Sequence, residues 1–188
     1  MTGPETDIST LLEGCVRRQP AAQKELVRRY AATLLSVARR YARTADAAED
    51  MLQDAYVLIF RKIDQYQAEK GSLLAWMRRI VIHTALAHYR NFRFQYEKAT
   101  DIFPETAVET APDILAQLSF QEILSLIETL PEGPRMVFNL SVFDHYSHDE
   151  IAALLQMPAG TSRSLLSRAR KLLQEKILNR QRNELARI

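Results

Sequence analysis

Apolar residues recur every three or four positions along most of this chain, and no long alternating stretch appears. This spacing places apolar side chains on one face of a helix, whereas alternation would indicate a strand. The apolar fraction, 47% of the residues, is sufficient for a hydrophobic core. The pattern therefore predicts an all-α fold. Its clearest stripe, between about residues 20 and 43, consists of Leu26, Tyr30, Leu34, Val37 and Tyr41.

Capping residues and chain breakers set the expected helix boundaries in the first half. Pro20 stops the first helix. Thr44 or Asp46 can cap the third, and Ser72 can cap the fourth, because their side-chain oxygens accept from the first backbone N–H groups. The helices expected in this half cover about residues 8–18, 20–43, 44–64 and 72–90.

The middle of the chain changes in composition. Between Glu97 and Asp113 there are five acidic residues, and the only basic residue is Lys98. Pro104 and Pro112 lie in the same stretch, which is typical of a linker with little fixed structure. We therefore expect two small helical domains, at residues 1–94 and 114–178. An acidic linker at 95–113 would join them, and a basic C-terminal tail would follow at 179–188.

The C-terminal half contains the pattern of a helix-turn-helix motif. Helical periodicity returns at 114–130, residues 131–134 are expected to form a turn, and a helix is expected at 135–142. Two further helices, at 148–156 and from about 158 into the 170s, flank a tight turn. Two short helices with this joint match a helix-turn-helix.

The second of these two helices has a basic face. At about 100° per residue, its bases and hydroxyls share one arc and its leucines fill the opposite arc. Cations with small hydroxyls suit a DNA major groove, although a solvated basic face is an equally good interpretation of the helix alone. The preceding helix and turn favour DNA binding. The residues on this face are Arg163, Ser164, Ser167, Arg168, Arg170 and Lys171.

The helix near residue 50 carries an acidic face. Asp46, Asp50 and Asp54 are spaced four residues apart, with Gln53 beside them. The face could dock a basic partner, but charge alone favours a solvated surface. A carboxylate metal site is less favoured, because no Glu-x-x-His pair accompanies the acids.

Bases alternate with aromatic residues between Trp76 and Phe94. This mixture suits single-stranded nucleic acid, where rings stack on bases and arginines hold phosphates. The alternative is that Trp76 lies in the core while Tyr89 and Phe92 cover the end of the domain. For Trp76 we expect the core position.

Four segments together resemble a known family. AEDMLQD (48–54) and GSLLAWMRRI (71–80) resemble region 2 of the extracytoplasmic-function (ECF) sigma factors of bacterial RNA polymerase. LPEGPRMVF (130–138) and GTSRSLLSRAR (160–170) resemble region 4. The resemblance covers about residues 20–175 in the expected order. It implies a promoter-recognition subunit made of the two helical domains predicted above.

The resemblance also implies roles for particular residues. Those that would dock on the clamp of the polymerase β′ subunit are Asp50, Gln53 and Asp54. Those that would capture or face the −10 element are Tyr66, Gly71, Ser72, Arg79, His83 and His88. Those that would read the −35 element are Thr161, Arg163, Ser164, Ser167, Arg168, Arg170 and Lys171.

Further partners follow from the same resemblance. The region 4 domain would bind the flap of the polymerase β subunit, and the acidic linker would follow the RNA-exit path. An anti-sigma factor is an expected regulator. The competing interpretation is a helix-turn-helix regulator that acts without being a polymerase subunit; such a protein would not need the acidic docking face.

Other functional classes find little support. The single cysteine, Cys15, excludes an internal disulfide framework and a Cys-rich zinc site, and a core position is its expected role. There is no Walker A or G-x-G-x-x-G loop, and the serines near Ser164 lack a catalytic base. We expect no catalytic residue, cofactor, metal or small-molecule substrate. Without a signal peptide or membrane-length apolar run, a cytoplasmic chain is expected.

The net charge of +2 is a sum of opposite parts. From Thr161 onward the sequence contains eight basic and two acidic residues, whereas the linker is acidic. A near-neutral total is therefore no argument against DNA as a partner.

Overall fold

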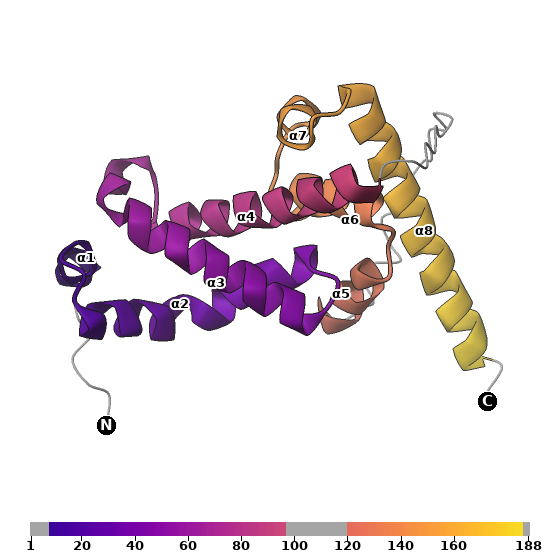
Figure 1. The fold of residues 1–188 in the computed structure, drawn as a ribbon. Helices are drawn as coiled ribbons and strands as arrows, with labels where there is room; N and C mark the ends of the chain where they lie inside the picture. The colour runs from indigo at the N-terminus through magenta and orange to yellow at the C-terminus, as the bar shows by residue number, and fades with distance from the viewer. Residues whose placement is uncertain (1–7, 97–119, 186–188) are drawn as a thin grey trace. The chain divides into compact units, whose positions relative to one another are not determined.

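The computed structural model describes residues 8–96 and 120–185, and every regular element in these ranges is helical. The prediction of an all-α fold is confirmed (Figure 1). The chain divides into two compact units, residues 1–91 and 92–188. Each unit is described by itself below.

The first unit is a bundle of four helices, α1 (Ile8–Val16), α2 (Pro20–Tyr41), α3 (Ala45–Lys62) and α4 (Leu73–Tyr96). Two short 3₁₀ turns, η1 (Ile63–Gln65) and η2 (Ala68–Lys70), connect α3 to α4. Thr44 caps α3 by accepting a hydrogen bond from the Ala47 amide at 3.1 Å. Pro20 occupies the first position of α2, where its missing N–H costs nothing.

The core of this unit contains the predicted stripe. Leu26, Leu34 and Tyr41 are fully buried on α2, while Tyr30 lies at the edge of the core. They pack against α3, and buried residues of α4 complete the core. The main contributors from those helices are Ala48, Ala55, Ile59, Met77, Val81 and Leu86.

Helices α1 and α2 approach each other closely at Gly14. A Cβ atom added there would lie 2.6 Å from the Cβ of Ala22, so only glycine permits this packing. The adjacent Cys15 is 1% exposed, and its burial raises the pKa of the thiol. The expected core position of Cys15 is confirmed.

The second unit contains α5 (Phe120–Glu128), α6 (Glu132–Phe138), the π-helical turn η4 (Asn139–Phe143), α7 (His148–Leu155) and α8 (Ala159–Leu185). Its core is formed by apolar residues from all four α-helices and η4. The most buried of them are Ile127, Met136, Val137, Leu140, Ile151, Leu155 and Ala169.

Two local predictions for this unit need correction. Residues 131–134 do not form a separate turn, because α6 begins at Glu132 with Pro131 as its N-cap. Pro134 lies in the first turn of α6, where a backbone N–H has no helical partner anyway. The helix expected at 135–142 therefore starts earlier, at Glu132. From Asn139 onward it is replaced by the π-helical turn η4.

Other predicted segments lie partly outside the described residues. The linker 95–113 falls there except for its first two residues, which continue α4. At the other end, α8 continues through Leu185, so much of the basic segment after residue 178 is helical. Within 8–96 and 120–185, none of the helices combines the length and apolarity needed to span a membrane.

Candidate nucleic-acid interface and docking surface

Helix α3 has one buried face and one exposed acidic face. Ala48, Met51 and Ala55 are buried against the bundle. The exposed face is one that the sequence predicted, and it can contact a partner without disturbing the core. Its exposed members are Asp46, Asp50, Gln53 and Asp54.

The same face carries an apolar residue that our sequence analysis missed. Val57 is 57% exposed, the largest value among the exposed large hydrophobic residues of the described chain. At about 100° per residue it falls within roughly 20° of Asp50 around the helix axis. An apolar centre with a polar rim is the usual composition of a protein interface.

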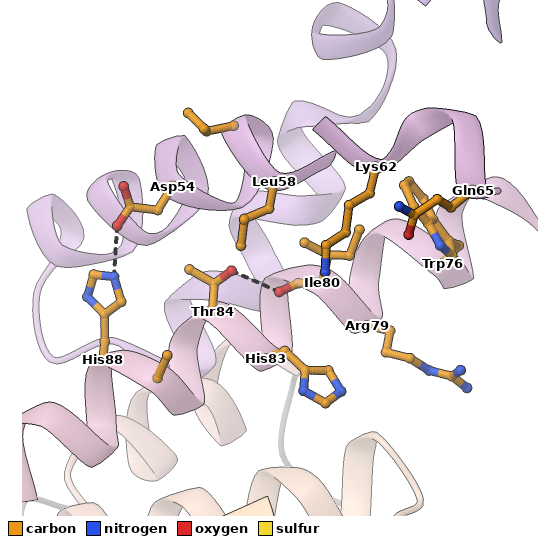
Figure 2. Close-up of a pocket in the computed structure, with 12 residues that line it drawn as sticks. Asp54, Leu58, Lys62, Gln65, Trp76, Arg79, Ile80, His83, Thr84 and His88 are labelled. Atoms are coloured by element: carbon orange, nitrogen blue, oxygen red, sulfur yellow. Dashed lines mark hydrogen bonds and ion pairs between the residues drawn. The ribbon is translucent and has the colours of Figure 1, made fainter. Parts of the chain in front are cut away.

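An ion pair links α3 to α4. The Oδ2 atom of Asp54 lies 2.9 Å from Nε2 of His88 (Figure 2). The side chains are 62% and 38% exposed, respectively, so solvent screens the pair. A predicted polymerase-docking residue and a predicted DNA-facing residue are thus partners in this structure.

The pair stands at one end of a groove between α3 and α4, with a volume of about 690 Å³. Arg79, His83 and His88 line it from α4, so three of the predicted −10 residues share one surface. Asp54 joins them from α3, whereas Asp50 and Gln53 lie outside the groove. Figure 2 shows the Lys62 side chain, also missed by the sequence analysis, extending from α3 toward α4.

Trp76 is not a core residue, contrary to our expectation. It is only partly buried and lines the groove beside Gln65 (Figure 2). Its ring centroid lies 5.9 Å from that of Tyr66, with an angle of 59° between the planes. Periodicity assigned Trp76 to the apolar face, but in the structure the residue lines the α3–α4 groove and stays partly exposed.

The predicted base-capture loop, residues 66–72, is held together by Tyr66. The Tyr66 hydroxyl donates to the carbonyl oxygen of Gly71 at 3.0 Å. Gly71 has φ +134°, a conformation that residues with a Cβ rarely adopt. Ser72 caps α4, as predicted, by accepting from the Ala75 amide at 3.2 Å. These contacts give the loop a defined shape.

The helix-turn-helix of the second unit has the predicted joint. Ser147 and Glu150 form a capping box at the start of α7: each side chain accepts from the other residue's backbone N–H. Gln156 adopts the left-handed conformation that ends α7. The next helix, α8, begins at Ala159 (Figure 1).

Helix α8 presents the predicted basic face. Leu166, Ala169 and Leu173 are buried against α6 and α7. The opposite face leaves the candidate DNA-reading side chains at least partly exposed. The exposed residues are Thr161, Arg163, Arg170 and Lys171, and the partly exposed residues are Ser164, Ser167 and Arg168.

Family models match both units. The sigma-70 region 2 model matches residues 26–94, and the sigma-70 region 4 model matches residues 120–173. The first range contains α3, the capture loop and the α3–α4 groove, and the second contains the helix-turn-helix. The two matches therefore cover the candidate surfaces of both units.

Similarity also extends along most of the chain. The ECF RNA polymerase sigma-E factor of Escherichia coli is 29% identical over 182 residues, covering 89% of this chain and 92% of that protein. The RNA polymerase sigma-H factor of Pseudomonas aeruginosa is 26% identical over 175 residues, covering 87% and 90%.

A solved structure shares the fold. The sigma factor RpoE of Bartonella quintana, crystallised with the anti-sigma factor NepR, matches with a TM-score of 0.50 and 25% identity. The match covers 83% of this chain and 96% of that chain. An ordinary helix-turn-helix regulator is not favoured, because region 2 matches as well as region 4. The chain therefore belongs to the extracytoplasmic-function sigma factors, the RNA polymerase subunits that direct transcription to promoters.

Proposed function

We propose that the exposed face of α3 docks on the clamp of the polymerase β′ subunit. Asp50, Gln53 and Asp54 supply the polar contacts, and Val57 supplies an apolar contact beside them. The exposure of all four side chains supports this role. Charge complementarity with a basic clamp surface accelerates association and sets orientation more than it adds affinity.

The −10 element is bound by the capture loop and α4. Tyr66, Gly71 and Ser72 shape the loop that receives a flipped base. Removing a base from the stack costs a few kcal/mol, which a preshaped pocket offsets. Arg79, His83 and His88 hold the backbone of the single strand along the groove. Trp76, partly exposed beside Tyr66, adds an aromatic surface suited to base stacking.

The −35 element is read by α8 in the major groove. Residues in the first turns of a recognition helix contact base edges, and the bases that follow contact phosphates. Arg163 and Ser164 stand in the first turns of α8. The remaining members of this surface are Thr161, Ser167, Arg168, Arg170 and Lys171. The second unit also contacts the flap of the β subunit.

Several further features complete the proposal. The acidic linker 95–113 follows the RNA-exit path of the polymerase. An anti-sigma factor regulates the chain, as NepR binds the Bartonella relative. The protein acts in the cytoplasm without a catalytic residue, cofactor or small-molecule substrate of its own.

The observation that carries this proposal is the separation of charge on exposed helical faces. Acids gather on α3 in the first unit, and bases gather on α8 in the second. A polymerase-bound DNA reader needs both, because its protein and DNA partners differ in charge.

The direct test combines the purified chain with core RNA polymerase and genomic DNA fragments. We expect co-elution with the core enzyme and discrete transcript 5′ ends that share −35 and −10 motifs. Sequence-specific DNA binding without any association with the core enzyme would contradict the proposal and would favour the regulator alternative.

A further inference from the structure

A hydrogen bond joins the two helices of the helix-turn-helix. Nδ1 of His148, the first residue of α7, lies 2.9 Å from Oγ of Ser162 on α8. Ser162 is 0% exposed, and His148 is partly buried. Ser162 stands between Thr161 and Arg163, two members of the proposed DNA-reading face.

Because Ser162 is buried, its hydroxyl depends on His148 for a hydrogen-bond partner. A buried hydroxyl without a partner costs more free energy than the average hydrogen bond contributes. Apolar contacts such as those of Ile151 and Leu166 hold α7 on α8 but have little directionality. The hydrogen bond is directional, and it fails if α8 slides or rotates by a fraction of a turn.

Burial and the charge around His148 both favour the neutral form of its imidazole. Burial lowers the pKa of His148, and the nearby guanidinium groups of Arg163 and Arg170 lower it further, while Asp149 opposes them. These arginines belong to the proposed DNA face of α8. A neutral imidazole can lie near the two guanidinium groups without adding a third positive charge.

We propose that His148 is a positioning residue for −35 recognition, which acts through Ser162 to set the register of α8 on α7. It does not itself contact a base in this proposal. Its effect is to fix the backbone between Thr161 and Arg163 relative to α7, both in its position along the axis of α8 and in its rotation about that axis. The inference rests on the proposed role of α8 in reading the −35 element.

The test uses holoenzyme assembled from the full chain and core polymerase. The probe is a promoter fragment whose start site has been mapped with the wild-type holoenzyme, in its native form and with a scrambled −35 hexamer. The measured quantity is the ratio of transcription from the two fragments. Affinity for the core enzyme and helix content by circular dichroism are measured for every variant.

We expect His148→Ala to lower this ratio about tenfold, because it leaves the Ser162 hydroxyl buried without a partner. His148→Asn is expected to stay within about twofold of wild type, since asparagine carries a hydrogen-bonding atom near the position of Nδ1. Ser162→Ala combined with His148→Ala is expected to lose no more than His148→Ala alone. His145→Asn, a change at an exposed histidine with φ 57°, is the matched control and is expected to leave the ratio unchanged.

Two results would overturn the inference: a wild-type ratio for His148→Ala, or an equal loss for His148→Asn with helix content preserved. The rescue by asparagine separates positioning from simple loss of folding. Arg168→Ala in the same assay separates the two proposals. If it leaves the ratio unchanged, the proposed DNA-reading role of α8 is wrong; if it lowers the ratio while His148→Ala does not, only the positioning role is wrong.

Discussion

Asp54 on α3 and His88 on α4 are 2.9 Å apart, although 34 residues separate them in the sequence. Each belongs to a different proposed surface, the first for the polymerase clamp and the second for −10 DNA. A partner that engages the Asp54 carboxylate therefore competes with His88, and a phosphate that engages His88 competes with Asp54. The two proposed surfaces of this unit therefore overlap at Asp54, and also at Val57, which lines the same groove.

The clearest prediction is a division of labour between the two units. Asp54→Ala is expected to weaken binding to the core enzyme several-fold, because it removes a charge from the docking face. Arg168→Ala is expected to leave core affinity within about twofold and to weaken −35-dependent initiation by about tenfold or more. Fluorescence titration with core polymerase and abortive transcription measure the two quantities. Identical effects of both changes on core affinity would contradict the assignment.

The Asp54–His88 contact is expected to contribute little to stability. Both side chains are partly solvated, so a double-mutant cycle of Asp54→Ala and His88→Ala should give a coupling free energy below about 1 kcal/mol. Urea unfolding followed by circular dichroism measures it, and the coupling should shrink further in high salt. A coupling of several kcal/mol would show that the pair holds α3 against α4.

Gly71 is expected to matter for opening the −10 element. In Gly71→Ala the new Cβ meets no atom within 4 Å, so the cost comes from the backbone at φ +134°. The loop is expected to lose the Tyr66–Gly71 hydrogen bond and to form open complexes several-fold more slowly, with core affinity unchanged. Permanganate reactivity of unpaired thymines measures opening. Gly160→Ala, at a helical glycine, is the control, and equal opening by both variants would contradict the prediction.

Acid is expected to destabilise the chain through His148. Its pKa in the folded state is below the ordinary value of 6.5, so the unfolded chain binds more protons between these two values. The contribution to stability is complete above 6.5 and declines as the pH falls from there through the folded-state pKa. His148→Asn should lack this decline. Urea unfolding of both proteins between about pH 5 and 8 tests the difference, and parallel curves would refute the prediction.

Local features were predictable from the sequence. The caps at Thr44 and Ser72 and the basic face of α8 depend on residues within a few positions of one another, which periodicity and capping rules describe. Residues 131–134 were misread because proline is compatible with both a turn and a first helical turn.

Contacts between helices were not predictable in the same way. The Asp54–His88 and His148–Ser162 contacts depend on how far each helix is rotated against its neighbour. The partial exposure of Trp76 likewise depends on how α3 and α4 form the groove that it lines. No short pattern in the sequence contains this information, because packing of the whole unit determines it.

The length of α8 gives its anchoring a mechanical consequence. Its 27 residues span about 40 Å at roughly 1.5 Å per residue. Arg180 and Glu122 are joined at 2.6 Å, which ties the far part of this rod to α5. Arg163, in the first turns of α8, lies about 25 Å from Arg180 along the helix axis. A tilt of about 8° about Arg180 would therefore displace Arg163 by about 3.5 Å, roughly one base-pair step. A contact remote from DNA thus affects recognition, because a small change in the angle of α8 at α5 shifts the DNA-reading residues by about one base-pair step.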